Sequence, residues 1–281
     1  MIIQHNISAI NSYRNLGTNQ SQLSKNLEKL SSGYKINRAG DNAAGLAISE
    51  QMRAQIAGLN QSVTNAKDAI GMIQTAEGAL TETHSMLNRM ATLFTQAANG
   101  TYSMNGVAGA DEQTARENIQ VEIQKLQDEI DRIADNTKFN GIKPLAQDGQ
   151  KLTFQIGPSA AETIQVTTSY MNVSSLLGGD VDGECLTVAD SNKAIDKVNE
   201  AINKVSKFRA ELGAAQNRLE HTINSLQVSS ENITAAESRI RDTDMADEIT
   251  AYTKNNILLQ AAQSMLTQAN ATPQGVLSML Q

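Results

Sequence analysis

The segment that decides the fold runs from residue 52 to residue 94 and reads MRAQIAGLNQSVTNAKDAIGMIQTAEGALTETHSMLNRMATLF. Its apolar residues recur in alternating steps of three and four, which is the spacing of one face of an α-helix. Only Glu77 and His84 interrupt this face, whose apolar members are Met52, Ile56, Leu59, Val63, Ala66, Ile70, Ile73, Leu80, Leu87, Ala91 and Phe94. The pattern predicts one helix of about fifty residues, about 75 Å long at 1.5 Å per residue.

Other segments of the chain carry the same helical spacing. These segments contain no proline, so nothing in them forces a helix to break. Pro273 and Gly275 follow the last segment and are expected to end its helix. These segments are 13–34, 119–133, 195–240 and, on a different phase, 245–266. Since the chain also has only 3% aromatic residues and no Trp, which is unusual for a compact globule, we predict a mainly α protein.

The segment from 139 to 170 departs from the helical spacing. Apolar and polar residues alternate there in two short runs that flank Gly157 and Pro158, which is the pattern of a β-hairpin. The alternating apolar residues are Leu152, Phe154, Ile156, Ile164 and Val166. Glycines in the following range, 171–190, predict a surface loop. That loop holds Cys185, the only cysteine, which can form no intramolecular disulfide and is expected to be an inert exposed thiol.

Two short charged breaks interrupt the helical segments, at 35–43 and at 241–244. Each end of the chain therefore has one shorter helix, a break and a longer helix, which suggests that the chain runs out and back with its ends side by side. Two interpretations of the charges remain open: ion pairs between the breaks, or solvated loop charges. The charges are Lys35, Arg38, Asp242 and Asp244.

The terminal helices carry more apolar surface than a pair of helices can bury. Each helix of a pair buries one face, yet the last helix has Leu258 and Met265 beside its stripe of Tyr252, Leu259 and Leu266. We predict that both ends are largely disordered in the free chain and fold against other copies of it. The residues assigned to this self-assembly are Ile7, Ile10, Leu16, Leu23, Leu27, Leu30, Tyr252, Leu258, Leu259, Met265, Leu266, Leu277 and Leu280.

The composition argues against several classes of partner. The formal net charge of −7 comes without a clustered excess of Lys and Arg, so a nucleic-acid partner is not expected. No run of about 18 apolar residues predicts a membrane span. The first residues show neither a basic leader nor an apolar core before a cleavage site, so a conventional signal peptide is not expected either.

Residues 40–45, GDNAAG, have the glycine spacing of a phosphate-binding loop but lack its chemistry. Such a loop needs Lys and then Ser or Thr after its second glycine, whereas Leu46 and Ala47 follow here. We interpret the stretch as a packing joint, in which Asp41 or Asn42 caps the long helix and Gly40 frees the turn before it. Gly45 then permits close approach of its neighbours.

No constellation of residues predicts a catalytic or metal site. The histidines at 5, 84 and 221 lie in different segments and in no ligand spacing, and His84 is expected to be structural. The acidic stretch 242–248 lacks the glycine and the final glutamate of a calcium loop, so its aspartates are better explained by a helix N-terminus. Hence we predict that the chain is not an enzyme and holds no cofactor or metal.

Six stretches of the sequence resemble bacterial flagellin, the subunit of the flagellar filament. They read LSSGYKINRAGDNAAGLAISEQMRAQI, NAKDAIGMIQTAEGALTET, FNGIKPL, LTFQIG and ESRIRDTDMADEI, and QANATPQGVLSML follows near the end. They span roughly the first 145 and the last 95 residues. The chain resembles a short member of that family, without the large central domains that many flagellins carry.

The resemblance implies a long antiparallel α-helical coiled-coil rod, formed by the N- and C-terminal segments, with a small central β-hairpin. In such a chain, residues 1–42 with 241–281 form the inner domain of the filament core. Residues 43–240 form the outer rod-like domain, with its hairpin at about 139–170 and its loop at about 171–190.

The resemblance also implies that the chain is secreted and lies in the extracellular bacterial flagellum. Members of the family are exported unfolded through the flagellar channel, without a cleaved signal and with an export chaperone. They assemble at the tip of the flagellum, in contact with cap and hook-associated proteins, as a homopolymer that serves motility.

A flagellin-sensing Toll-like receptor of the host recognises the family through the long helix of the rod. The motif resembles LNRMATLFTQAAN here, so the resemblance assigns receptor contacts to Arg89, Leu93 and Glu122. The motif departs from known agonists at Ala91, Thr92 and Phe94. The other interpretation of these positions is a helix surface packed against neighbouring subunits.

Three alternatives to flagellin remain, the first of them within the same class of protein. A hook-filament junction protein resembles flagellin at both ends, but QTAEGALTE and PQGVLSML favour flagellin. An α-helical enzyme would need a catalytic constellation. A receptor-type coiled coil would need a membrane span.

Overall fold

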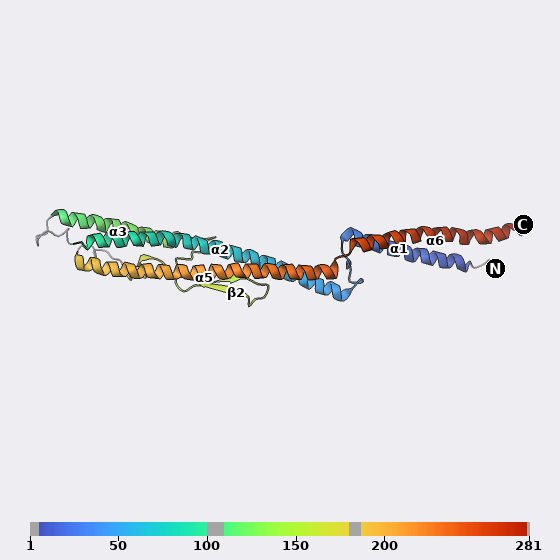
Figure 1. Ribbon diagram of the computed structural model, residues 1–281, viewed down its shortest axis with the longest axis horizontal. Helices are drawn as coiled ribbons and strands as arrows, with labels where there is room; N and C mark the ends of the chain where they lie inside the picture. The colour runs from blue at the N-terminus through green and yellow to red at the C-terminus, as the bar shows by residue number, and fades with distance from the viewer. Residues whose placement is uncertain (1–5, 100–109, 180–186, 280–281) are drawn as a thin grey trace. The chain divides into compact units, whose positions relative to one another are not determined.

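A computed structural model describes residues 6–99, 110–179 and 187–279, and the side chains of 6–99, 116–179 and 187–275 among them (Figure 1). The elements, in chain order, are α1 (Ile7–Ser32), α2 (Ala43–Ala97), α3 (Ala110–Asn136), β1 (Lys151–Gln155), β2 (Thr163–Thr167), α4 (Val173–Leu177), α5 (Val188–Arg241) and α6 (Met245–Met279). The described chain is mainly α with one small antiparallel sheet, which confirms the predicted fold class.

The chain divides into two compact units. The first comprises residues 1–57 and 230–281, and the second comprises residues 58–229. Helices α2 and α5 contribute to both units, with 55 and 54 residues respectively. Their length confirms the helix of about fifty residues that the apolar spacing predicts, and both are free of proline.

The second unit contains almost all of the apolar core. Helices α2, α3 and α5 run side by side in Figure 1, and their facing sides bury a continuous cluster. Its largest fully buried side chains include Ile73, Leu80, Leu87, Met90, Leu93, Phe94, Ile123, Ile130 and Leu219. Among the described residues, Ile36 is the only buried apolar residue that lies outside 58–229.

The hairpin is attached to the long helix of the same unit. Strands β1 and β2 pair in antiparallel register, with Leu152 opposite Val166 and Phe154 opposite Ile164, as the alternation predicts. The Asn65 side chain on α2 donates to the Gln155 carbonyl at 3.1 Å. This bond ties the end of β1 to the helix.

The loop predicted at 171–190 contains a one-turn helix, α4. The Asn172 side chain accepts from the Ser175 amide at 2.9 Å and caps the helix, while Gly178 ends it with φ at 75°. Val173, Leu176 and Leu177 are buried, so the glycines bound an element of the core that the loop prediction missed. Cys185 lies outside the described residues.

Pro273 does not end the last helix, contrary to the prediction. Helix α6 continues through it to Met279. Proline lacks the N–H that would bond to the Ala269 carbonyl four residues earlier. That carbonyl instead accepts from the Asn6 side chain at 2.8 Å and from the Thr272 hydroxyl at 3.1 Å, so the helix can tolerate the proline.

Candidate assembly surface of the terminal helices

Helices α1 and α6 of the first unit form an antiparallel pair. They lie side by side in Figure 1, and contacts between them occur at both ends of α1. Asn6 contacts Ala269 at one end, and the Lys29 ammonium lies 3.8 Å from the Glu248 carboxylate at the other. The predicted adjacency of the two chain ends holds for these helices.

The seam between α1 and α6 is only partly apolar. Six of the residues predicted for self-assembly lie in it and are half-buried: Leu16, Leu23, Leu30, Tyr252, Leu259 and Leu266. No described side chain of α6 is buried, and on α1 only Asn26 is, with 8% exposed. The terminal pair therefore has no buried apolar core of its own among the described residues.

Asn26 is held by polar groups of both helices. In the amide orientation that gives its oxygen and nitrogen partners, the nitrogen donates to the Gln22 carbonyl and to the Glu248 carboxylate, at 3.0 and 3.2 Å. The oxygen accepts from the Asn255 side chain at 3.0 Å. A buried Asn between paired helices favours one register at a cost in stability, because any shift leaves its amide without partners.

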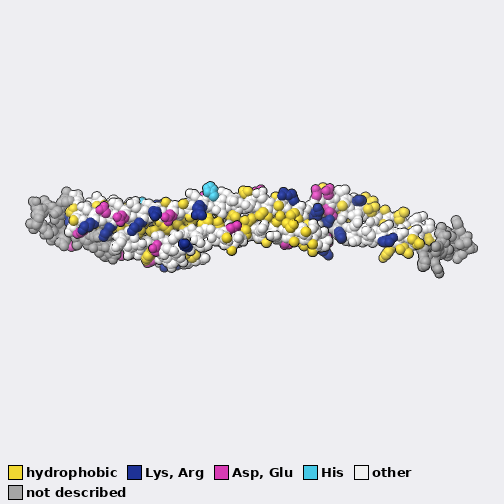
Figure 2. All heavy atoms as spheres, turned by 90° about the horizontal axis from the view of Figure 1, so that it is seen from below, with side chains coloured by type: hydrophobic (Ala, Val, Ile, Leu, Met, Phe, Trp, Pro, Cys, Tyr) yellow, Lys and Arg dark blue, Asp and Glu magenta, His cyan; other side chains and the backbone are white. Residues whose placement is uncertain are grey.

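The remaining described residues of the predicted set are exposed. Ile7 and Met265 are the extremes, at 63% and 65% exposed, and the others are Ile10, Leu27 and Leu258. Further exposed apolar residues of the same pair are Tyr13, Met245, Ile249 and Ile257. Figure 2 shows hydrophobic side chains at the surface along this part of the chain. The Leu277 side chain and Leu280 lie outside the described residues.

The structure corrects the phase of the first helical pattern. The spacing from Tyr13 to Tyr34 places Tyr13 and Leu27 on one stripe with Leu16 and Leu23, yet both are more than half exposed. The seam instead alternates Leu16, Leu23 and Leu30 with polar residues such as Asn26. A search for apolar residues alone misses these polar seam positions.

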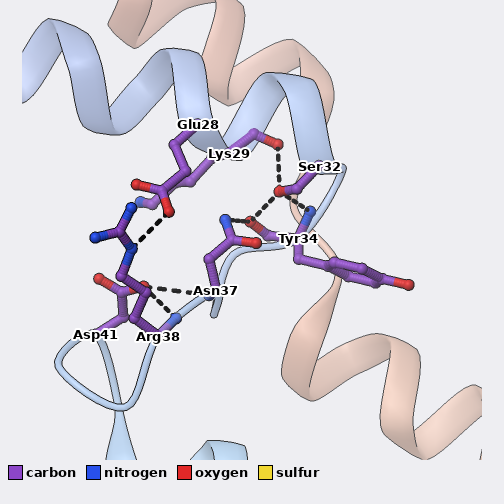
Figure 3. Close-up of polar contacts among 7 residues, drawn as sticks. All are labelled: Glu28, Lys29, Ser32, Tyr34, Asn37, Arg38 and Asp41. Carbon is purple, nitrogen blue, oxygen red and sulfur yellow. Dashed lines mark hydrogen bonds and ion pairs between the residues drawn. The ribbon is translucent and has the colours of Figure 1, made fainter.

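The break between α1 and α2 is ordered by hydrogen bonds within it, as Figure 3 shows. The Asp41 carboxylate accepts from the Asn37 and Arg38 backbone amides at 3.2 and 3.1 Å. The Arg38 guanidinium in turn lies 2.8 Å from the Glu28 carboxylate. Asn42, and not Asp41, caps α2, because its side chain accepts from the Gly45 amide at 3.0 Å.

The amide bonds to Asp41 make this turn sensitive to pH. They lower the pKa of Asp41 below its ordinary value of 3.8. Ionised Asp41 therefore stabilises the turn fully above pH 3.8, and this contribution is lost as the pH falls through the lowered pKa. In an NMR titration, we expect the Asn37 and Arg38 amide shifts to change with a midpoint below 3.8, and Asp41→Asn to abolish that change. A midpoint at or above the ordinary value would contradict the assignment.

Gly45 acts as the packing joint that the sequence predicts, although its closest neighbours are side chains. A Cβ added there would lie 2.8 Å from Cδ1 of Ile36 and 3.0 Å from the Asn42 side chain. Ile36 is 4% exposed, so it has little room to move away. The glycine thus lets the break pack against the first turn of α2.

The two breaks meet through the main chain. The Lys35 amide donates to the Arg241 carbonyl at 2.6 Å, and the Thr243 amide donates to the Gly33 carbonyl at 3.0 Å. The predicted charges do not pair across the breaks among the described ion pairs. All four are exposed, and Arg38 pairs with Glu28 of α1 instead. Asp244 caps α6 by accepting from the Ala246 amide at 2.9 Å, as its position at a helix start predicts.

Tyr34 adds a side-chain clamp at the same junction. Two guanidinium groups face its ring, that of Arg53 at 5.3 Å and that of Arg241 at 4.9 Å from the ring centre. Arg53 also donates to the Tyr34 hydroxyl at 2.8 Å. Each arginine has an acidic partner, Glu237 at 3.2 Å from Arg53 and Glu50 at 2.5 Å from Arg241. The sequence reasoning missed this clamp, because its members lie in three separate segments.

The predicted receptor contacts lie in the second unit, and one of them is buried. Two nitrogens of Arg89 on α2 bond to one carboxylate oxygen of Glu122 on α3, at 2.7 and 2.8 Å. Both side chains are exposed, at 55% and 44%. Leu93 is only 2% exposed, because it packs in the helical core, and it offers no surface in this conformation.

Two features of the described residues bear on other functions. No helix among them is long and apolar enough to cross a membrane. Within the same residues, no cluster of three or more His, Cys, Asp or Glu side chains has the arrangement of a metal site.

Comparisons with known proteins agree with this architecture. The profile of the bacterial flagellin N-terminal helical region matches residues 3–150, and that of the bacterial flagellin C-terminal helical region matches residues 195–280. The flagellin of Bacillus subtilis (strain 168) is 49% identical over 312 aligned residues, which cover 100% of each chain. The flagellar filament 33 kDa core protein of Treponema phagedenis is 46% identical over 294 aligned residues, again with full coverage of both.

The fold is shared more widely than the sequence. A solved structure from Vibrio parahaemolyticus, provisionally assigned as a flagellar hook-associated protein, has a TM-score of 0.60 at 10% identity and covers 72% of this chain and 100% of that one. Long helices with a small hairpin place the chain in the class of mainly α-helical proteins. Both profiles and the full-length relatives then establish that it belongs to the bacterial flagellin family.

Proposed function

We propose that this chain is a structural subunit of the bacterial flagellar filament and polymerises through its terminal helices. The observation that carries the proposal is the apolar surface that α1 and α6 leave exposed, from Ile7 to Met265. Membership of the flagellin family supports it, as does the similarity to a flagellar filament core protein. A filament of this kind lies outside the cell and serves motility.

The energetics of the terminal pair favour association with further copies. Burying one exposed Ile, Leu or Met side chain is worth about 1.5–3 kcal/mol, and the pair exposes several of them. A surface patch that meets a different patch on the next copy gives a contact that repeats without closing, which generates a filament. Copies of the same chain can thus supply the core that the pair lacks.

The same observation supports the predicted division of the chain into an inner and an outer domain. Residues 1–42 with 241–281 would form the inner filament core, and residues 43–240 the outer rod, whose helices already bury a continuous cluster. In the free subunit the two ends would be largely disordered, because a pair that buries only Asn26 on α1 gains little from folding alone. Export before assembly, with a chaperone, and growth beside cap and hook-associated proteins complete this proposal.

Met265→Glu tests the assembly surface directly. The substitution removes an apolar side chain that is 65% exposed and would bring a carboxylate into the contact between copies. We expect the critical concentration for polymerisation to rise by at least about tenfold, as measured by sedimentation and electron microscopy. Gln263→Glu, on an exposed position of the same helix, adds the same charge and should polymerise like the unmodified chain.

The result separates three possibilities. Unimpaired filaments from Met265→Glu would contradict the proposed surface. A hook-filament junction protein, the alternative within this class, would not extend into long filaments in the unmodified form. Long filaments from the unmodified chain, together with their loss in Met265→Glu alone, support the filament subunit.

We propose a second role for the exposed Arg89–Glu122 pair, as part of the surface that a flagellin-sensing Toll-like receptor of the host contacts. The pair presents a guanidinium on α2 and a carboxylate on α3 side by side. Leu93 is buried and would contribute indirectly, by keeping α2, and with it Arg89, packed against the core.

Arg89→Ala is expected to weaken a receptor-reporter response by about tenfold while it leaves thermal stability nearly unchanged. An exposed ion pair contributes only about 0–1 kcal/mol to folding, whereas a charged contact with a partner can contribute more. Arg132→Ala removes the comparable exposed pair with Glu129 on α3 and serves as the matched control. Equal dose responses for Arg89→Ala and the unmodified chain would rule out the contact.

A further inference from the structure

We infer that Asn6 sets the register of the terminal helix pair by filling the hydrogen-bond gap that Pro273 opens in α6. This inference rests on the proposed assembly through those helices and names a residue that positions them. It concerns a contact between residues 263 positions apart in the chain.

The gap is a consequence of proline within a helix. In α6 each carbonyl accepts from the amide four residues later, but Pro273 has no N–H to offer to the Ala269 carbonyl. Ala269 and Pro273 are both half-buried. A half-buried carbonyl that has lost its helical donor costs free energy unless another donor reaches it.

Asn6 supplies that donor and caps α1 at the same time. Its side-chain nitrogen donates to the Ala269 carbonyl at 2.8 Å, while its side-chain oxygen accepts from the Ala9 amide at 3.1 Å. One amide group thereby bonds to the α6 carbonyl that lacks its helical donor, beside the Thr272 hydroxyl at 3.1 Å, and to a free donor of α1. Asp and Ser are equally good caps, but an ionised Asp has no donor and Ser is shorter.

The contact discriminates between registers because the gap is local. Along α6 before Pro273, the other carbonyls have helical amide donors, so only the Ala269 carbonyl lacks one, and it accepts from Asn6 as well as from the Thr272 hydroxyl. A shift by one helical turn, about 5.4 Å, would leave both the amide and the Ala269 carbonyl without this bond. The half-buried leucines of the seam would discriminate less, because a shift exchanges one apolar neighbour for another.

Asn6 and Asn26 together mark the two ends of the pairing. They are 20 positions apart on α1, which is about 30 Å of helix. Asn26 meets Glu248 and Asn255 near the start of α6, and Asn6 meets Ala269 further along it. A pair held in one register presents its exposed apolar residues in one arrangement, which a regular polymer requires.

A double-mutant cycle tests the inference in the full chain. Asn6→Ser keeps a cap but removes the long donor, and Pro273→Ala restores an amide that can bond to the Ala269 carbonyl. We expect Asn6→Ser to raise the critical concentration for polymerisation by about tenfold, and by less than about twofold when Pro273→Ala is also present. Asn15→Ser, at an exposed position of α1, is the matched control and should change little.

The outcomes distinguish the inference from the function on which it rests. Filaments from the unmodified chain, with a strong effect of Asn6→Ser that Pro273→Ala suppresses, support both. Filaments from the unmodified chain with an equal effect of Asn6→Ser in both backgrounds, or with no effect, overturn the register role alone. Failure of the unmodified chain to form any filament overturns the proposed function and the inference with it.

Discussion

A chain that lacks residues 1–32 and 245–281 is expected to remain a soluble monomer under conditions in which the full chain forms filaments. The deletion removes α1 and α6, and with them the exposed apolar side chains that other copies would cover. It removes no buried apolar side chain among the described residues, since Ile36 and the whole helical cluster are retained. Electron microscopy and light scattering after seeding provide the measurement.

Thermal unfolding of the same truncated chain supplies the control. Because the apolar cluster lies within 58–229, the melting temperature of the truncated monomer should stay within a few degrees of that of the free full-length subunit. A truncated chain that melts normally and still forms filaments would refute the role of α1 and α6. Loss of filaments together with loss of folding would instead show that the second unit depends on the ends.

Phe94→Ala is expected to give the largest loss of stability among single substitutions in the second unit. Phe94 is fully buried in the cluster of α2, α3 and α5, so truncation leaves a cavity that the neighbouring helices fill only in part. Phe→Ala at such a site costs about 3–5 kcal/mol. Chemical denaturation, followed by circular dichroism at a wavelength for helix, measures this free energy of unfolding.

Two companion substitutions show whether burial is the cause. Phe94→Leu retains most of the apolar volume and should cost less than Phe94→Ala. Val121→Ala truncates a side chain on α3 that is 55% exposed, and it should change the stability by less than about 0.5 kcal/mol. Equal losses for Phe94→Ala and Val121→Ala would show that the cluster does not determine the stability of this unit.

The long helices could be predicted because their signal is local and repeats many times. The face that begins at Met52 persists over about twelve turns without proline, and no other regular structure has this spacing. The hairpin could also be predicted from the sequence, since Leu152 and Phe154 alternate with polar residues before a glycine and a proline. In both cases the residues that carry the signal are close together in the sequence.

The errors arose where distant residues decide the local structure. Pro273 was predicted to end α6, but Asn6, from the other end of the chain, bonds to the carbonyl that the proline leaves free. Leu93 was assigned to a receptor contact by resemblance to the family's motif, which does not show how α2 packs against its neighbours, and the side chain is 2% exposed. A helix packed against two others has a wider apolar face, and here it buries both Leu93 and Phe94.

The terminal surface was predicted in outline but not in detail. The excess of apolar residues identified the two helices, yet the partition between seam and exposed surface depends on how the helices are rotated. Asn26 is the one buried described side chain of α1 and carries no apolar signal. The domain boundaries at 42 and 241, and the assembly residues themselves, stay predictions until a filament is analysed.

The way in which the two breaks meet has a consequence for variation among relatives. At the joint, the bonds from Lys35 to Arg241 and from Thr243 to Gly33 use only main-chain atoms. Any amino acid except proline can supply those amides, so substitutions at 35 or 243 can accumulate without breaking the two hydrogen bonds. Selection there would act on the length of each break, since one inserted residue would move the donor amides away from their acceptor carbonyls.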